Sequence, residues 1–145
     1  MESTKVYTKA MLQEECGLVD VSEFTFTRDV YKQKAKKRVV TVSSPTLRYD
    51  LTKDKQVARY VNAVVSLYNY KTGKYIGMPY SKLVWIWNYG SCPIDVCIDH
   101  IDTNSLNNKL ENLRAVSQTE NRRNTKCWKP FLVDEIKNKS VEEVC

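Results

Sequence analysis

The sequence predicts an α+β protein in which a β-rich N-terminal region precedes a short unit of strand, loop, strand and helix. Three observations lead to this class. Runs of β-branched and aromatic residues, bounded by turn residues, fill much of the first half of the chain. Apolar and polar residues alternate over residues 94–99, and residues 117–120 (Ser-Gln-Thr-Glu) form a capping box that starts a helix. We therefore expect a β-rich region at residues 1–78, the compact unit at 79–126, and a tail with a short helix at 127–145.

The composition describes a protein with an apolar core that needs no crosslinks. The chain has 145 residues, of which 42% are hydrophobic and 28% charged, and a domain of this size buries about two thirds of its surface. The five cysteines are odd in number, and no two of them are spaced like zinc-knuckle ligands. We expect a reduced, intracellular protein without structural zinc. No segment reaches the roughly 20 apolar residues of a membrane span, so membrane insertion and secretion are not expected.

The formal net charge of +6 favours a polyanionic partner. Much of the basic excess lies early, immediately before the β-branched run at residues 39–42. If this stretch is extended, alternate side chains share one edge and are spaced like neighbouring phosphates. A solvated strand edge that prevents aggregation is the alternative, and the pattern does not decide between them. The candidate nucleic-acid contacts here are Lys32, Lys34, Lys36, Lys37 and Arg38.

The local signals place the remaining elements. The apolar runs at 63–68 and 75–76 flank a glycine-containing turn at 71–74, which predicts a hairpin. Pro79 then fits the start, and Gly90 the end, of a short aromatic helix that we assign to the core. A half-buried strand ends near residue 99, a polar loop follows, a second strand covers 113–116, and a helix begins at about residue 118.

Four polar residues converge where this strand, loop and helix meet: Asp99, His100, Asn112 and Asn121. A carboxylate and an amide oxygen suit Mg²⁺, which keeps its other positions for water and phosphate. A neutral imidazole can take a proton from water, and a second amide oxygen can accept its other N–H and fix the tautomer. Adjacent residues of an ideal strand point to opposite faces, so the strand must end, twist or bulge at Asp99 for both to serve one site.

These residues resemble a known family, the HNH endonucleases of the ββα-metal type, and in particular their phage and intron homing branch. The resemblance extends over roughly residues 79–126 and rests on the strings Ile98-Asp99-His100-Ile101-Asp102, Asn107-Asn108, Glu111-Asn112-Leu113-Arg114 and Glu120-Asn121. It implies that His100 is the general base, that Asn112 orients its imidazole, and that Asp99 and Asn121 hold one Mg²⁺ or Mn²⁺ ion. It further implies hydrolysis of double-stranded DNA to a 5′ phosphate, in a bacterial cytoplasm if the chain is phage-encoded. Whether the protein is a monomer or a homodimer stays open.

Three arginines near the site match no required position of the family pattern. Arg114, Arg122 and Arg123 are either phosphate contacts or exposed arginines of no special role. Asn107 and Asn108 are expected to hold the loop through side-chain to backbone hydrogen bonds. Six residues of the hairpin could face the duplex: Tyr60, Tyr68, Tyr70, Lys71, Lys74 and Tyr75. The alternative, which we favour, is that the tyrosines cover the junction with the nuclease unit.

The sequence departs from the family pattern at three points. Thr103 stands where the family has a glycine, so we expect Asn104 to take the positive φ that the loop needs. Ser81 and Lys82 occupy the place of a histidine in the preceding helix, and the paired zinc-binding cysteines of many HNH nucleases are missing.

Two other functions compete with a nuclease. A DNA-binding or assembly protein on a degenerate HNH fold would explain the basic stretch and the replaced glycine. A structural zinc site built from Cys92, Cys97, His100 and Cys127 would remove the histidine from catalysis, but the spacing of these residues is irregular.

Overall fold

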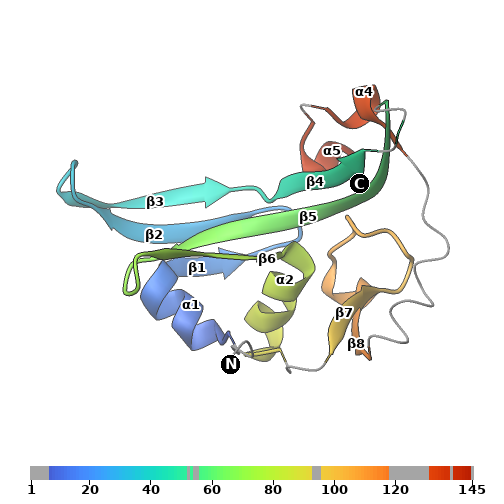
Figure 1. Ribbon diagram of the computed structural model, residues 1–145. Coiled ribbons are helices and arrows are strands. Elements are labelled where there is room, and N and C mark those ends of the chain that lie inside the picture. The colour runs from blue at the N-terminus through green and yellow to red at the C-terminus, as the bar shows by residue number, and fades with distance from the viewer. Residues whose placement is uncertain are drawn as a thin grey trace.

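The protein is a mixed α+β fold of small antiparallel sheets with few helices (Figure 1). The computed structural model describes residues 7–51, 53, 56–92, 96–117, 131–137 and 139–144. The first half contains α1 (Lys9–Cys16), β1 (Leu18–Val21), β2 (Phe26–Lys32), β3 (Lys37–Ser43), β4 (Thr46–Leu51), β5 (Val57–Asn69) and β6 (Lys74–Pro79). It is followed by α2 (Tyr80–Tyr89), β7 (Cys97–His100), the 3-10 helix η1 (Leu110–Asn112), β8 (Leu113–Val116), β9 (Phe131–Leu132), α4 (Val133–Ile136) and α5 (Val141–Val144).

The first sheet has the strand order β1-β2-β3 and follows α1. Thr8 caps the start of α1 by accepting a hydrogen bond from the Met11 amide, and Gly17 ends the helix at a φ of 72°. The contact along one strand edge considered from the sequence required the basic stretch before residue 39 to be extended. The structure shows that it is not one continuous strand. Residues 33–36 form the turn between β2 and β3, and Lys36 takes a φ of 51°. The lysines therefore surround a hairpin turn instead of sharing one strand edge.

The second sheet is built on β5, which pairs with β4, β6 and β9. Its odd-numbered side chains from Val61 to Asn69 are buried, whereas those between them are half-buried or exposed, as expected for a strand with one face on the core. The turn after β5 confirms the predicted hairpin. The Asn69 side chain accepts hydrogen bonds from the amides of Lys71 and Thr72, and Gly73 has a φ of 74°.

Helix α2 has the predicted ends, with Pro79 as N-cap and Gly90 as C-cap. It contacts β1, β5 and β6 on one side and β7 and η1 on another, so it lies between the sheets and the β7–β8 pair (Figure 1). Tyr80, Leu83 and Ile86 are fully buried, which confirms the assignment of this helix to the core. The helix thus fixes the β7–β8 pair against the N-terminal sheets.

The C-terminal segment forms one short strand and two short helices instead of the single helix expected. Strand β9 pairs with the start of β5, and α4 and α5 contribute Ile136 and Val141 to the core. One cluster of buried side chains runs from Leu12 in α1 to Val141 in α5. None of the described helices has the length and apolar character needed to cross a membrane.

Candidate active site

The site is built on two short antiparallel strands, β7 and β8, in regular register from Cys97↔Val116 to His100↔Leu113. No bulge interrupts this pairing in the part of the chain that the structure describes. The strand instead ends at His100, and a turn begins at Ile101. Asp99 and His100 are thus consecutive residues of one regularly paired strand, and the described residues show neither an end nor a bulge at Asp99.

Asp99 is buried and paired with Arg114 across the strands. The residue is only 4% exposed, and the Arg114 Nε and Nη2 atoms lie 3.0 and 2.9 Å from the same oxygen, Oδ2. The Arg114 side chain keeps about half of its surface in solvent. Arg114 was predicted as a phosphate contact. The structure places it first as the counterion of a buried carboxylate, because a charge at this depth needs a partner.

The imidazole of His100 is half-buried and bonded to Asn108, whose amide oxygen lies 2.7 Å from Nε2. Because a carbonyl oxygen only accepts hydrogen bonds, Nε2 is the donor in this contact. Asn108 is 1% exposed, so its amide is held by packing. Asn108 therefore occupies the position relative to the imidazole that the sequence analysis gave to Asn112.

Asn112 has a different set of partners, which corrects its expected contact with the imidazole. Its Oδ1 accepts from the Asp102 amide at 3.1 Å, while its Nδ2 donates to Asp102 Oδ1 at 3.0 Å and to the Asn107 carbonyl at 2.9 Å. Its backbone carbonyl accepts from the Ile101 amide at 2.8 Å. The physical reason is that the loop after His100 carries polar backbone groups that need partners, and the 91%-buried amide supplies them. Asn112 closes the loop and acts on the site through it.

Asp102 is the centre of that loop. Besides Asn112, its carboxylate accepts from the Asn104 amide and from the Asn107 side chain, each at 2.8 Å. Burial alone would raise the pKa of Asp102, but the hydrogen bonds from Asn107, Asn104 and Asn112, together with the nearby His100, lower it below its usual value. The loop is therefore fastened around an ionised carboxylate.

Thr103, which stands in place of the family glycine, itself takes the left-handed backbone conformation. Thr103 itself has a φ of 64°, whereas Asn104 was expected to take the positive φ. The Thr103 amide donates to the His100 carbonyl at 2.9 Å, and the flanking Asp102 and Asn104 are both engaged in the loop. This hydrogen bonding offsets the cost of about 1–2 kcal/mol for a left-handed threonine.

Two contacts anchor the loop to the body of the protein. Leu106 is 1% exposed and belongs to the common core, and the Ser105 hydroxyl donates to the Val61 carbonyl on β5. Neither anchor was predicted from the sequence, nor was the contact of Asn108 with His100. The spacing of Asp102, Asn104 and Asn107 is typical of Asx turns, which could have indicated the loop clamp. No local pattern indicates which side chain meets the imidazole.

The described part of the donor set fits a hard divalent cation in type. Asp99 supplies a buried carboxylate, of which Arg114 engages one oxygen, and Mg²⁺ favours one or two carboxylate ligands together with waters. The second predicted ligand, Asn121, and the predicted contacts Arg122 and Arg123 lie outside the described residues. Within the described ranges, no group of three or more histidine, cysteine, aspartate or glutamate side chains gathers as a metal site. Cys127 also lies outside them.

The predicted nucleic-acid contacts of the first half are all exposed, but they are not equivalent. Lys32, Lys34, Lys36 and Lys37 surround the β2–β3 turn. Arg38 is bound within the sheet, since its Nε lies 3.2 Å from Asp29 Oδ1 and its Nη2 donates to the Asp29 carbonyl at 3.0 Å. Its charge is already partly compensated, in contrast with that of the lysines.

Comparison with known proteins adds one finding. Residues 81–123 match the family model of the HNH endonuclease, a range that begins in α2 and extends through β7, the clamped loop and β8. Neither the comparison with curated proteins nor that with solved structures gave a match.

Proposed function

Since the segment 81–123 belongs to the HNH endonuclease family, we propose that this protein is a metal-dependent DNA endonuclease that hydrolyses phosphodiester bonds. His100 is the general base, Asp99 and Asn121 hold one Mg²⁺ or Mn²⁺ ion, and double-stranded DNA is the substrate. One observation carries the proposal: consecutive residues at the end of β7 are a buried carboxylate, bound by Arg114, and an imidazole, bound by Asn108.

The roles of the protein groups follow from their contacts. Asn108 holds the His100 ring with Nε2 protonated, so Nδ1 is the nitrogen that takes the proton from the attacking water. Asn112 holds the loop that carries Asn108. The ion, when bound, would stabilise the charge on the phosphoryl group and the departing 3′ oxygen. Arg114 positions the Asp99 carboxylate, the proposed ligand, through Oδ2.

The experiment is cleavage of supercoiled plasmid by purified protein with Mg²⁺ or Mn²⁺, with EDTA as the metal-free control. We expect His100→Ala to lower the cleavage rate by about 10²–10⁴-fold, the usual contribution of a general base. Lys139→Ala, an exposed position in the C-terminal segment, is the matched control and should cleave like the wild type. Wild-type rates for His100→Ala would exclude the mechanism. Mapping both strands of an end-labelled duplex then distinguishes nicking from double-strand cleavage.

A second function, DNA binding without cleavage, is favoured by one observation. Thr103 adopts the left-handed conformation in place of the family glycine, and a loop altered in this way could hold the imidazole without serving catalysis. This alternative predicts a strongly salt-dependent gel shift with no metal-dependent cleavage. Any cleavage that His100→Ala removes would exclude it.

A further inference from the structure

Two hairpin ends outside the candidate active site carry charge that the fold does not use. Residues 30–49 contain six basic and no acidic residues, and residues 55–94 contain five basic and no acidic residues. Five of the first group, all except Arg48 on β4, surround the β2–β3 turn. The second includes Lys71 and Lys74 at the β5–β6 turn.

The lysines at the β2–β3 hairpin end repel one another and so destabilise the free protein. Lys32 and Lys37 lie directly opposite one another in the last pair of the hairpin, where like charges are destabilising. Lys34 and Lys36 add two more charges in the turn between them. Among the described residues, no acidic side chain forms an ion pair with any of these four lysines. An arrangement that repels itself in the free protein is suited to an external polyanion.

The β5–β6 end adds exposed aromatic rings to its lysines. Tyr68 stacks edge-on with Tyr70 and Tyr75, at ring-centroid distances of 4.9 and 5.0 Å, and Tyr75 is 72% exposed. From the sequence, the tyrosines of this hairpin were expected to cover the nuclease junction. For Tyr68, Tyr70 and Tyr75 the structure contradicts that expectation, because the β5–β6 hairpin end lies on the left in Figure 1, whereas β7 and β8 lie on the right.

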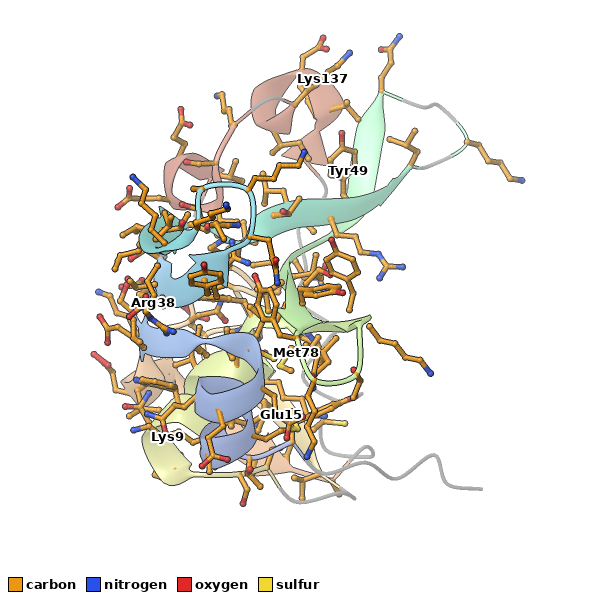
Figure 2. All side chains as sticks on the ribbon, turned by 90° about the vertical axis from the view of Figure 1, so that its left-hand side faces the viewer. Lys9, Glu15, Arg38, Tyr49, Met78 and Lys137 are labelled. Carbon is orange, nitrogen blue, oxygen red and sulfur yellow. The ribbon has the colours of Figure 1, made fainter. Side chains whose placement is uncertain are left out.

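The two hairpin ends face the same way. Both reach the left-hand side of Figure 1, and Figure 2 looks onto this side, with Arg38 on β3 and Glu15 on α1 labelled. The Tyr70 amide donates to the Glu15 carbonyl at 2.8 Å, and the Asn69 side chain donates to the Glu15 carboxylate at 2.9 Å. The β5–β6 turn is therefore held against the end of α1 instead of moving independently.

Strand β5 runs from this end to the loop of the candidate active site. The catalytic loop is bonded to β5 at Val61, and the hairpin turn begins after Asn69, eight residues further along the same strand. At about 3.3 Å per residue this separation is roughly 26 Å. The same length of B-DNA contains about eight base pairs.

We propose that the two hairpin ends form a second duplex-contacting surface, which holds the DNA about eight base pairs to one side of the phosphodiester at the candidate active site. The occupant is double-stranded DNA, because the lysines match its phosphates in charge and the spacing along β5 matches a rigid duplex. This inference rests on the proposed function for the position of the second contact. The proposed surface includes the four lysines but not Arg38, whose guanidinium already forms an ion pair with Asp29.

The test is DNA binding by His100→Ala protein in EDTA, which measures the surface apart from cleavage. A fluorescent 30-base-pair duplex is titrated over a KCl series with three further variants: the four-lysine variant (Lys32, Lys34, Lys36 and Lys37 to Gln), the pair Lys71→Gln and Lys74→Gln, and the control Arg38→Gln. We expect the four-lysine variant to bind at least tenfold more weakly, with a salt slope reduced by about 0.9 for each lost phosphate contact. Arg38→Gln should stay within twofold. Unchanged affinity and slope in both lysine variants would overturn the proposal.

Duplex length tests the spacing. The parent protein should bind a 24-base-pair duplex much more tightly than an 8-base-pair duplex at equal nucleotide concentration, and the four-lysine variant should lose most of this preference. Equal binding to both lengths by the parent protein, or tenfold better competition by single-stranded DNA than by duplex, would overturn the proposal. The melting temperatures of the lysine variants should equal or exceed that of the parent, since they lose the Lys32 to Lys37 repulsion.

The outcomes separate the two proposals. A protein that binds duplex through the hairpins but never cleaves plasmid with Mg²⁺ or Mn²⁺ contradicts the nuclease and keeps the surface. A protein whose cleavage is lost in His100→Ala, but whose lysine variants bind duplex like the parent, contradicts only the proposed second DNA-contacting surface.

Discussion

Replacing Asn108 and Asn112 one at a time separates the residue that positions the imidazole from the residue that closes the loop. Asn112 loses three side-chain hydrogen bonds on substitution by alanine, each worth about 0.5–1.5 kcal/mol. We expect Asn112→Ala to lower the free energy of unfolding by about 2–4 kcal/mol. In a protein of this size this corresponds to a decrease in melting temperature of roughly 6–12 °C.

Asn108 should show the opposite balance. Its one side-chain contact among the described residues is the 2.7 Å bond to His100 Nε2, while its Nδ2 is buried without a partner there. Asn108→Ala therefore removes one hydrogen bond and also an unsatisfied donor, and should cost only about 1 kcal/mol of stability. Its effect on cleavage should be larger, about 10–100-fold, which is typical for the partner that orients a functional histidine.

The assay combines urea unfolding in EDTA with single-turnover plasmid cleavage over a range of pH. Cleavage by Asn108→Ala should be lower than wild type, with a shifted pH profile, because the tautomer of His100 is no longer fixed. Cleavage by folded Asn112→Ala should keep the wild-type profile. If Asn108→Ala cleaves normally, while Asn112→Ala shifts the profile at unchanged stability, the assignment of Asn108 to the imidazole is wrong.

Three further predictions concern individual contacts, two at the site and one at the end of α1. Arg114→Gln leaves the buried Asp99 without its counterion and should cost about 1–2 kcal/mol, less than for a fully buried pair because the guanidinium is half exposed; Asp99→Asn in the same chain should recover part of the loss, and a double-mutant cycle in urea measures the coupling. Gly17→Ala should cost about 1–3 kcal/mol, because a Cβ would lie 2.6 Å from Val30 Cγ1 at a φ of +72°; an unchanged urea midpoint would contradict this geometry. Folding lowers the pKa of Asp102, so its ionised carboxylate stabilises the folded protein. This contribution is complete above the usual aspartate pKa of 3.8 and is lost as the pH falls through the folded-state pKa. Asp102→Asn should therefore flatten the dependence of stability on pH, measured by urea unfolding at acid pH.

The elements that the sequence predicted correctly are those with local signals. The β5–β6 turn has its glycine, α2 has Pro79 and Gly90 at its ends, and β8 covers the predicted residues 113–116. Each of these depends on backbone preferences of residues close in sequence. The α+β class follows from them.

The elements that it missed depend on partners far along the chain or on unusual backbone. Residues 33–36 turn without glycine, proline or asparagine, and Lys36 takes the positive φ, so no turn residue marks the hairpin. Strand β9 is two residues long and exists through its pairing with Val57 and Ala58. The choice of Asn108 over Asn112 as partner of His100 is tertiary in the same way. Both are asparagines of one loop, and only the closed loop decides which amide meets the ring.

Strand β5 explains why the two proposed functions of the protein belong to one rigid frame. Its buried face, Val61 to Asn69 in steps of two, packs on the core that also contains α1 and α2. A shift of one residue in its register would turn this face to solvent, so the positions of Val61 and Asn69 are fixed together. Val61 holds the loop that follows His100 through Ser105, and Asn69 shapes the basic hairpin turn. The spacing between the proposed cleavage site and the proposed second DNA contact is therefore determined by one strand, and we expect changes in loop sequence at either end to leave it constant.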